Sequence, residues 1–189
     1  MRHKYETSGI VLSRSPLGEA NVLVALLTPD LGLVRARAQG LRRSGAKLAS
    51  PLKTLSESSV VLVRGRESWR VVGAVLEVDW FARLGSATLR ERAGRICSLL
   101  LRLVAGEAND PALFPTVRGF FNALATLRED SHEAAEILAV LRILSALGFD
   151  TGGTPGAPSV FTERLLADVI KERVPYIARI NNGLNASGL

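Results

Sequence analysis

Two different spacings of apolar residues divide the chain. Up to about residue 78, short runs rich in Val and Leu alternate apolar with polar residues, and Gly, Pro, Ser or Asn separates the runs. This period of two predicts strands, because successive side chains of a strand point to opposite faces of its sheet. The predicted strands are 8–14, 22–28, 33–39, 58–64 and 69–78.

These strands predict a small closed or nearly closed antiparallel barrel. Before residue 79 no helical pattern is long enough to cover a sheet, and closing the sheet removes its exposed edges. In the third strand Val34, Ala36 and Ala38 share one face, while Arg35 and Arg37 lie on the other. An SH3-like barrel is an alternative, since the number of strands alone does not fix the topology.

From about Asp79 the apolar spacing becomes helical. The predicted helices cover 87–107, 110–130, 130–149 and 161–180. The third is apolar around most of its circumference, which predicts the central helix of a bundle. Asp130 and Glu133 match a capping box at its start, and Gly148 matches a stop signal at its end. Pro175 should break or kink the last helix, and the tail NNGLNASGL is expected to fray.

The change of period predicts two domains and an α+β multidomain fold. Residues 1–79 form the barrel domain and residues 80–189 the helical domain. A flexible loop at 150–159, DTGGTPGAPS, is rich in Gly and Pro and interrupts the helical domain.

Charge is concentrated in the first domain. The chain has 189 residues and a net charge of +6, and residues 1–82 hold 12 Lys or Arg against 7 Asp or Glu. The stretch from Leu31 to Lys53 contains six cations and no acid. Such an excess indicates a polyanionic partner, with nucleic acid favoured over a membrane. The simpler alternative is a solvated strand face with a charged loop.

The spacing of these cations fits a sugar-phosphate backbone. The Cα atoms of Arg35 and Arg37 should lie roughly 6.8 Å apart on one strand face, close to the phosphate repeat of an extended strand. The segment GLRRSGAK is not a phosphate-binding P-loop, because Lys47 is out of register and no Ser or Thr follows it. Trp69 is the best candidate for base stacking, and the alternative is a core or interdomain role. The predicted nucleic-acid contacts are Arg35, Arg37, Arg42, Arg43, Lys47, Lys53, Arg64, Arg66, Trp69 and Arg70.

The sequence shows no catalytic or metal-binding constellation. His3 and His132 are the only histidines and Cys97 is the only cysteine, so neither a metal cluster nor an internal disulfide is expected. We therefore expect no enzymatic activity, no metal and no cofactor. The single cysteine fits a reducing cytosol. Neither a signal peptide nor a membrane-spanning helix is predicted.

Several landmarks resemble the RecO family of bacterial recombination mediators. They are GIVL, the LGEAN turn, TPDLGLV and the basic RARAQGLRRSGAKL with its following PL, together with the helix LAVLRILSALGFD. The resemblance spans roughly residues 5–150. It implies a five-stranded OB-fold barrel followed by an all-α helical bundle. It also implies a cytoplasmic, nucleoid-associated protein that binds single- and double-stranded DNA and anneals complementary strands.

The resemblance further implies protein partners. Members join the ring-forming mediator RecR, contact the C-terminal tail of the single-strand-binding protein, and help to load the recombinase RecA. Arg142, with Leu138 and Leu141 nearby, could offer an apolar and cationic site for that acidic tail; an ordinary bundle arginine is the alternative. An RNA-binding barrel protein, or an adaptor without a nucleic-acid role, remains an alternative function.

One feature departs from the family. Many relatives place a four-cysteine zinc cluster just after the helix that ends in Leu-Gly. This chain has TGGTPGAPSV there and no cysteine, so a structural zinc is excluded for lack of ligands.

Overall fold

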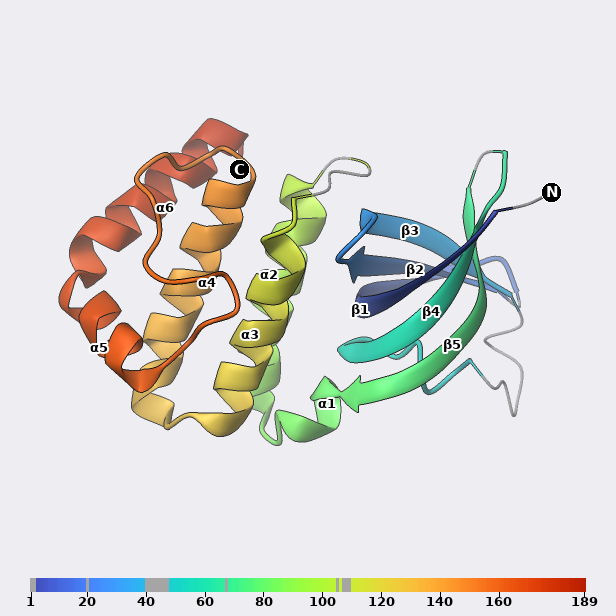
Figure 1. Cartoon of the computed structure of the whole chain (residues 1–189), viewed down its shortest axis with the longest axis horizontal. Coiled ribbons are helices and arrows are strands. Elements are labelled where there is room, and N and C mark those ends of the chain that lie inside the picture. Colours follow the sequence, from blue (N-terminus) through green and yellow to red (C-terminus); the bar gives the residue numbers. More distant parts are fainter. Residues whose placement is uncertain (1–2, 20, 40–47, 67, 105, 107–109) are drawn as a thin grey trace. The chain divides into compact units, whose positions relative to one another are not determined.

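A computed structural model describes residues 3–19, 21–39, 48–66, 68–104, 106 and 110–189. These residues divide into two compact units. The first runs to Arg83 and also takes in Gly106, and the second holds the remainder from Leu84 onward. The sequence-based boundary after residue 79 lies one short helix before this division. Figure 1 shows the barrel of the first unit and the helices of the second.

The first unit is a closed five-stranded barrel with the order β1-β2-β3-β5-β4. Its elements are β1 Lys4–Leu17, β2 Asn21–Thr28, β3 Gly32–Ala38, β4 Ser56–Arg64, β5 Trp69–Asp79 and the short α1 Trp80–Arg83. β1 pairs antiparallel with both β2 and β4, whereas β3 pairs parallel with β5. This closed order is that of the OB-fold, so the expected barrel is confirmed and the SH3-like alternative is not adopted.

Strand β1 is longer than its apolar run and serves two neighbours. A bulge between Val11 and Ser13 shifts its register, and bulges increase the local bend and twist of a strand. The strand can therefore leave β4 and continue along β2. Inward-facing side chains such as Val24, Ala36 and Leu62 fill the barrel and are 0% exposed. Their burial accounts for the alternation seen in the sequence.

The second unit is a bundle built around one apolar helix. Its elements are α2 Ala87–Leu103, α3 Leu113–Thr126, the 3-10 turn η1 Glu129–Ser131, α4 His132–Ala146, α5 Glu163–Lys171 and α6 Arg173–Ser187. α4 packs against α2, α3, α5 and α6, which confirms the central position predicted for it. Most of its side chains are buried, as its nearly uniform apolar sequence requires.

Two local predictions in this unit are wrong. Ser131 precedes α4 and makes no side-chain capping bond, and Asp130 belongs to η1. Glu133 instead accepts a hydrogen bond from Arg173, 2.8 Å away.

The tail does not fray, because α6 continues to Ser187 and ends at Gly188 with a left-handed backbone. The chain breaks between α5 and α6 at Glu172, so Pro175 lies in the first turn of α6, where proline is tolerated.

Candidate nucleic-acid interface

Strand β3 carries two arginines on the outside of the barrel. Val34, Ala36 and Ala38 are 0% exposed and fill the interior. Alternation then places Arg35 and Arg37 outward, where Arg35 is exposed and Arg37 is half-buried. The apolar positions of β3 thus fix the direction of its charges.

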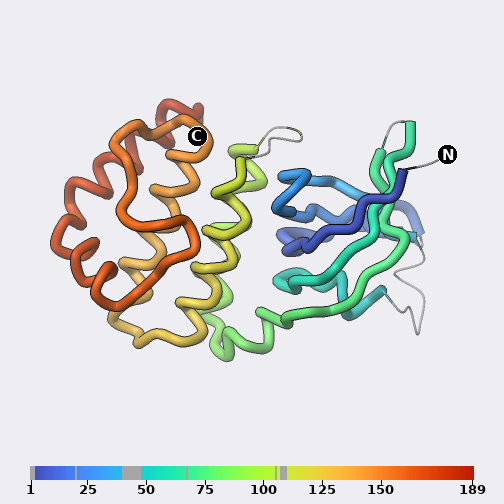
Figure 2. Tube along the Cα trace, viewed as in Figure 1, coloured from blue at the N-terminus to red at the C-terminus, as the bar shows by residue number. Residues whose placement is uncertain are grey.

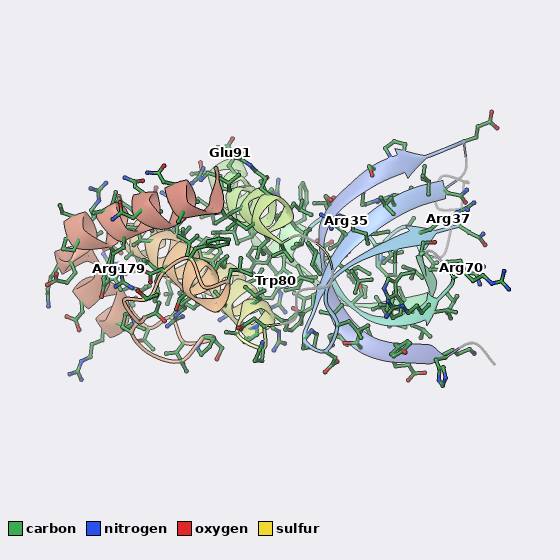
Figure 3. All side chains as sticks on the ribbon, turned by 90° about the horizontal axis from the view of Figure 1, so that it is seen from above. Arg35, Arg37, Arg70, Trp80, Glu91 and Arg179 are labelled. Carbon is green, nitrogen blue, oxygen red and sulfur yellow. The ribbon has the colours of Figure 1, made fainter. Side chains whose placement is uncertain are left out.

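A third arginine lies directly beside them. In the parallel pair of β3 and β5, Arg37 is opposite Arg70. Neighbouring strands are about 4.8 Å apart, and like charges placed directly opposite one another are destabilising. Figure 3 shows Arg35, Arg37 and Arg70 on the barrel. We call these three residues the basic face.

No acid in the described part of the chain balances the basic face. Its three arginines form no ion pair or hydrogen bond among the residues that the structure describes. The Nε of Arg37 is buried and has no acceptor there. The uncompensated positive charge of these three guanidinium groups is suited to a ligand that brings negative oxygens, such as a phosphate.

The turn between β4 and β5 adds two further arginines at the same end of β5. Arg64 ends β4 opposite Trp69, and Arg66 is exposed in the turn. The Arg64 guanidinium lies 5.3 Å from the centre of the Trp69 ring. Trp69 itself is 6% exposed and packs in the barrel core, edge-on to Tyr5 at 5.2 Å. Its ring has no free face for a base, and we leave Trp69 out of the proposed interface.

Lys53 lies elsewhere on the barrel. It belongs to the turn that leads into β4, where Ser56 pairs with Asp79 at the far end of β5. Arg70, in contrast, is next to the first residue of β5. The structure therefore separates Lys53 from the basic face. The predicted contacts Arg42, Arg43 and Lys47 lie outside the described residues.

Lys4 is a candidate that the sequence analysis missed. It is exposed, and β1 places it opposite Val63, which is itself opposite Arg70. Two strand spacings, about 10 Å, thus separate Lys4 from Arg70 around the barrel. The sequence pattern did not predict a strand at this position, because His3, Lys4 and Glu6 do not show the apolar alternation of a strand.

The residues predicted to bind a partner's tail lie in the interior of the bundle. Leu138 and Leu141 are 0% exposed and Arg142 is 3% exposed. Arg142 donates its hydrogen bonds to backbone carbonyls of the same chain. This burial gives no support to a surface role for these three residues.

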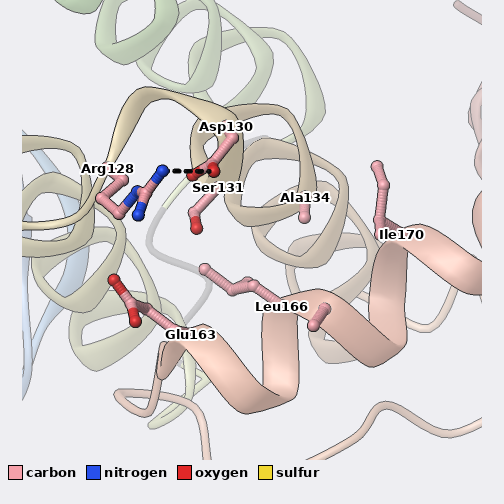
Figure 4. A pocket seen from close by; sticks show the side chains of 8 residues that line it. Arg128, Asp130, Ser131, Ala134, Glu163, Leu166 and Ile170 are labelled. Atoms are coloured by element: carbon pink, nitrogen blue, oxygen red, sulfur yellow. Dashed lines mark ion pairs between the residues drawn. The ribbon is translucent and has the colours of Figure 1, made fainter.

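The helical unit has a cavity of about 360 Å³ between η1, the start of α4 and α5 (Figure 4). Leu166, Ala134 and Ile170 supply apolar walls. Its charged groups balance one another in part, because Arg128 pairs with Asp130 at 3.4 Å and Glu163 lines the cavity too. The cavity therefore lacks the uncompensated positive charge of the basic face.

None of the helices in the described part of the chain is both long and apolar enough to cross a bilayer.

A closed five-stranded barrel with this strand order defines a protein of the OB-fold class. The family model described as "Recombination protein O N terminal" matches residues 1–76. Together with the relatives below, this match shows that the chain belongs to the RecO family. It is an atypical member, since the zinc-cluster cysteines are missing.

Three curated relatives illustrate the similarity, each named "DNA repair protein RecO". The protein of Dehalococcoides mccartyi is 32% identical over 127 residues, which are 67% of this chain and 48% of the relative. That of Bifidobacterium adolescentis is 34% identical over 151 residues, 77% of this chain and 59% of the relative. That of Thermobifida fusca is 30% identical over 155 residues, 77% of this chain and 60% of the relative. The chain thus spans between about half and three fifths of the length of these relatives.

Proposed function

We propose that this protein binds single- and double-stranded DNA through the basic face and anneals complementary strands in recombinational DNA repair. The observation that carries the proposal is the direct juxtaposition of Arg37 and Arg70, with no acid of the described residues to balance them. Family membership supports the assignment of the polyanion as DNA.

The proposed mechanism is electrostatic and needs no bond cleavage. Two complementary strands repel one another through their phosphates. Arginines that neutralise those phosphates release condensed counterions and let the strands approach, after which base pairing completes the duplex. Because these contacts are to phosphates and Trp69 is buried, binding should depend little on base sequence.

The proposal includes protein partners of the recombination pathway. As a family member, the protein would join a RecR-type mediator, contact the C-terminal tail of the single-strand-binding protein and help to load the recombinase. A role in the repair of chromosomal DNA would locate the protein at the nucleoid. These roles rest on the family alone, and binding to each purified partner tests them separately from DNA annealing.

An annealing assay with matched charge variants tests the main proposal. The variant Arg37→Ala/Arg70→Ala should anneal two labelled complementary oligonucleotides at a rate reduced roughly tenfold or more, because two charge-assisted contacts are lost. The control Arg102→Ala/Arg164→Ala removes the same charge from exposed helical arginines that form no ion pair within the described residues. It should anneal like wild type.

Two outcomes would replace the proposal. Tighter binding of matched RNA than DNA, without annealing, would indicate an RNA-binding barrel protein. Unchanged oligonucleotide binding by the Arg37 and Arg70 variant, with loss of partner binding, would indicate an adaptor.

A further inference from the structure

The family resemblance implies a zinc cluster after the helix that ends in Leu-Gly, and the residues of this chain do not fit one. The full sequence has a single cysteine, Cys97. It lies in α2, and burial raises the pKa of its thiol to about 12, which disfavours the thiolate that binds zinc. The described residues contain no group of three metal ligands. The segment between α4 and α5, residues 150–161, must be held by other means; we call it the strap.

A buried arginine holds the C-terminal half of the strap. Arg142 of α4 donates from Nη1 to the carbonyls of Pro158 and Val160, at 2.9 and 3.0 Å. Its Nη2 donates to the carbonyl of Pro155 at 2.7 Å. The guanidinium also lies 4.6 Å from the centre of the Phe161 ring. Three strap carbonyls and one aromatic face thus surround a single cation, and this fork of planar donors is one that lysine cannot reproduce.

A second arginine holds the N-terminal half. Arg179 of α6 forms a two-pronged ion pair with Asp150, from Nε to Oδ1 at 3.0 Å and from Nη2 to Oδ2 at 2.5 Å. It also donates to the carbonyl of Gly153 at 2.6 Å. The hydrogen bond from Arg179 lowers the pKa of Asp150, so this pair persists at neutral pH. Figure 2 shows the strap, in orange, running along the helices of the bundle.

A glycine in α3 allows the strap to lie close to the helix. A Cβ at Gly119 would be 2.5 Å from the carbonyl oxygen of Ser159 and 3.0 Å from the Phe161 ring. The strap itself bends at Gly156, whose φ is 71°, and a Cβ there would be 3.2 Å from Arg142 Nη2. Residues of α3, α4 and α6 therefore all contact the strap or leave room for its backbone.

We propose that Arg142 is a positioning residue. It fixes the strap and, through the strap, the start of α5. In this chain it thereby takes the structural role that a zinc cluster would have at this point of the sequence. The strap ends at Phe161, directly before Thr162, whose hydroxyl caps α5 by accepting a hydrogen bond from Leu165. A buried charge is costly unless its partners are arranged around it. Here the partners are carbonyls of the strap, so the charge favours the docked strap over a detached one.

Substitution of Arg142 by methionine distinguishes this role from simple filling of space. Methionine keeps much of the volume but donates no hydrogen bond, and replacing buried charges by apolar groups is often neutral or stabilising. If Arg142 holds the strap, Arg142→Met should speed amide hydrogen exchange at Val160, which donates to Ala157, roughly tenfold or more. Exchange in α2 should not change. Arg142→Lys should give a smaller increase in the same segment.

The control is Arg102→Met, at an exposed arginine of α2, which should leave strap exchange unchanged. Should Arg142→Met fail to fold, Gly119→Ala provides an independent test, because its methyl group would push the strap away from α3. Strap exchange at the wild-type rate in every folded variant would overturn the proposal. So would a fall in the melting temperature of the wild-type protein on addition of a metal chelator. None of these measurements involves DNA, so their failure is separate from failure of the proposed function.

Discussion

Glu57 is a carboxylate enclosed in the barrel unit, and Trp80 is one of its partners. Glu57 is 2% exposed and Trp80 is 3% exposed, and the indole Nε1 donates to Oε2 at 2.9 Å. Hydrogen bonds to charged groups contribute more to stability than neutral ones, and a buried charge that loses a donor is penalised. This pair therefore fixes α1 against β4.

Replacing Trp80 by phenylalanine should lower the free energy of unfolding by about 1.5–3 kcal/mol, since the phenyl ring donates no hydrogen bond to Glu57. Urea unfolding followed by circular dichroism measures this. Val75→Ala is the control, because Val75 is 68% exposed and should change stability by less than about 0.5 kcal/mol. A Trp80→Phe midpoint equal to that of wild type would contradict the role given to the pair.

Glu136 makes the helical unit sensitive to acid. Desolvation alone would raise its pKa, but hydrogen bonds from Arg95 and Arg92 outweigh that effect and hold the pKa below the usual value. Nε of Arg95 lies 2.6 Å from Oε1 of Glu136. Because the folded-state pKa is depressed, this stabilisation is complete above the unfolded pKa of about 4.3 and is lost as pH falls through the folded value.

Glu136→Gln should therefore reduce stability at pH 7 and flatten its pH dependence below about pH 4.3. Melting temperatures between pH 7 and pH 3 measure both effects. If the melting temperatures of the variant and the wild type differ by the same amount throughout this pH range, the ionisation of Glu136 beside Arg95 and Arg92 does not contribute to stability.

At the scale of elements, two helical glycines have opposite environments. Gly183 lies in α6 and is buried, and a Cβ there would be 3.0 Å from Leu144 and 3.2 Å from the carbonyl of Phe149. Gly94 lies in α2, and a Cβ there would meet nothing within 4 Å. Close packing of α6 on α4 thus leaves little room for a side chain at 183, whereas a side chain at 94 would meet no neighbour.

Gly94→Ala should stabilise the protein by roughly 0.5–1 kcal/mol, because alanine loses less backbone entropy in a helix. Gly183→Val should instead destabilise it by about 1–3 kcal/mol through overpacking. Chemical denaturation of both variants in parallel tests the contrast. Destabilisation by both, to a similar extent, would contradict the packing of α6 described here.

The sequence predicted elements best where one pattern dominated. Apolar alternation identified all five strands, and the nearly uniform apolar sequence of 130–149 identified the central helix α4. The sequence-based prediction failed where tertiary contacts determine the extent of a helix or the partner of a side chain. α6 persists to Ser187 because Gly183 packs on Leu144, a contact that the polar sequence of the tail does not reveal. Similarly, Glu133 pairs with Arg173 of a distant helix in place of a local cap.

The candidate interface was predictable only in part. Alternation in β3 correctly placed Arg35 and Arg37 on its outer face. The position of Arg70 beside Arg37 depends on the parallel pairing of β3 with β5, which no local pattern encodes. The same topology moves Lys53 to the other end of β5 and brings Lys4 toward the arginines.

For the whole molecule, the unequal distribution of charge follows the division into units. The excess of basic residues belongs to the barrel, whereas arginines of the helical unit are largely committed to internal contacts such as those of Arg142, Arg179 and Arg95. The proposed DNA contact therefore falls on the barrel unit, and most arginines of the helical unit serve its own fold.

The dependence of single-stranded DNA affinity on salt tests this assignment most directly. If six barrel cations engage, the slope of log K against log salt should be about −4, and Arg37→Ala/Arg70→Ala should reduce it to about −3. Arg102→Ala/Arg164→Ala, with the same net charge, should keep the wild-type slope. Equal slopes for both double variants, or a wild-type affinity that does not change between about 50 and 200 mM salt, would contradict the basic face as the site of DNA binding.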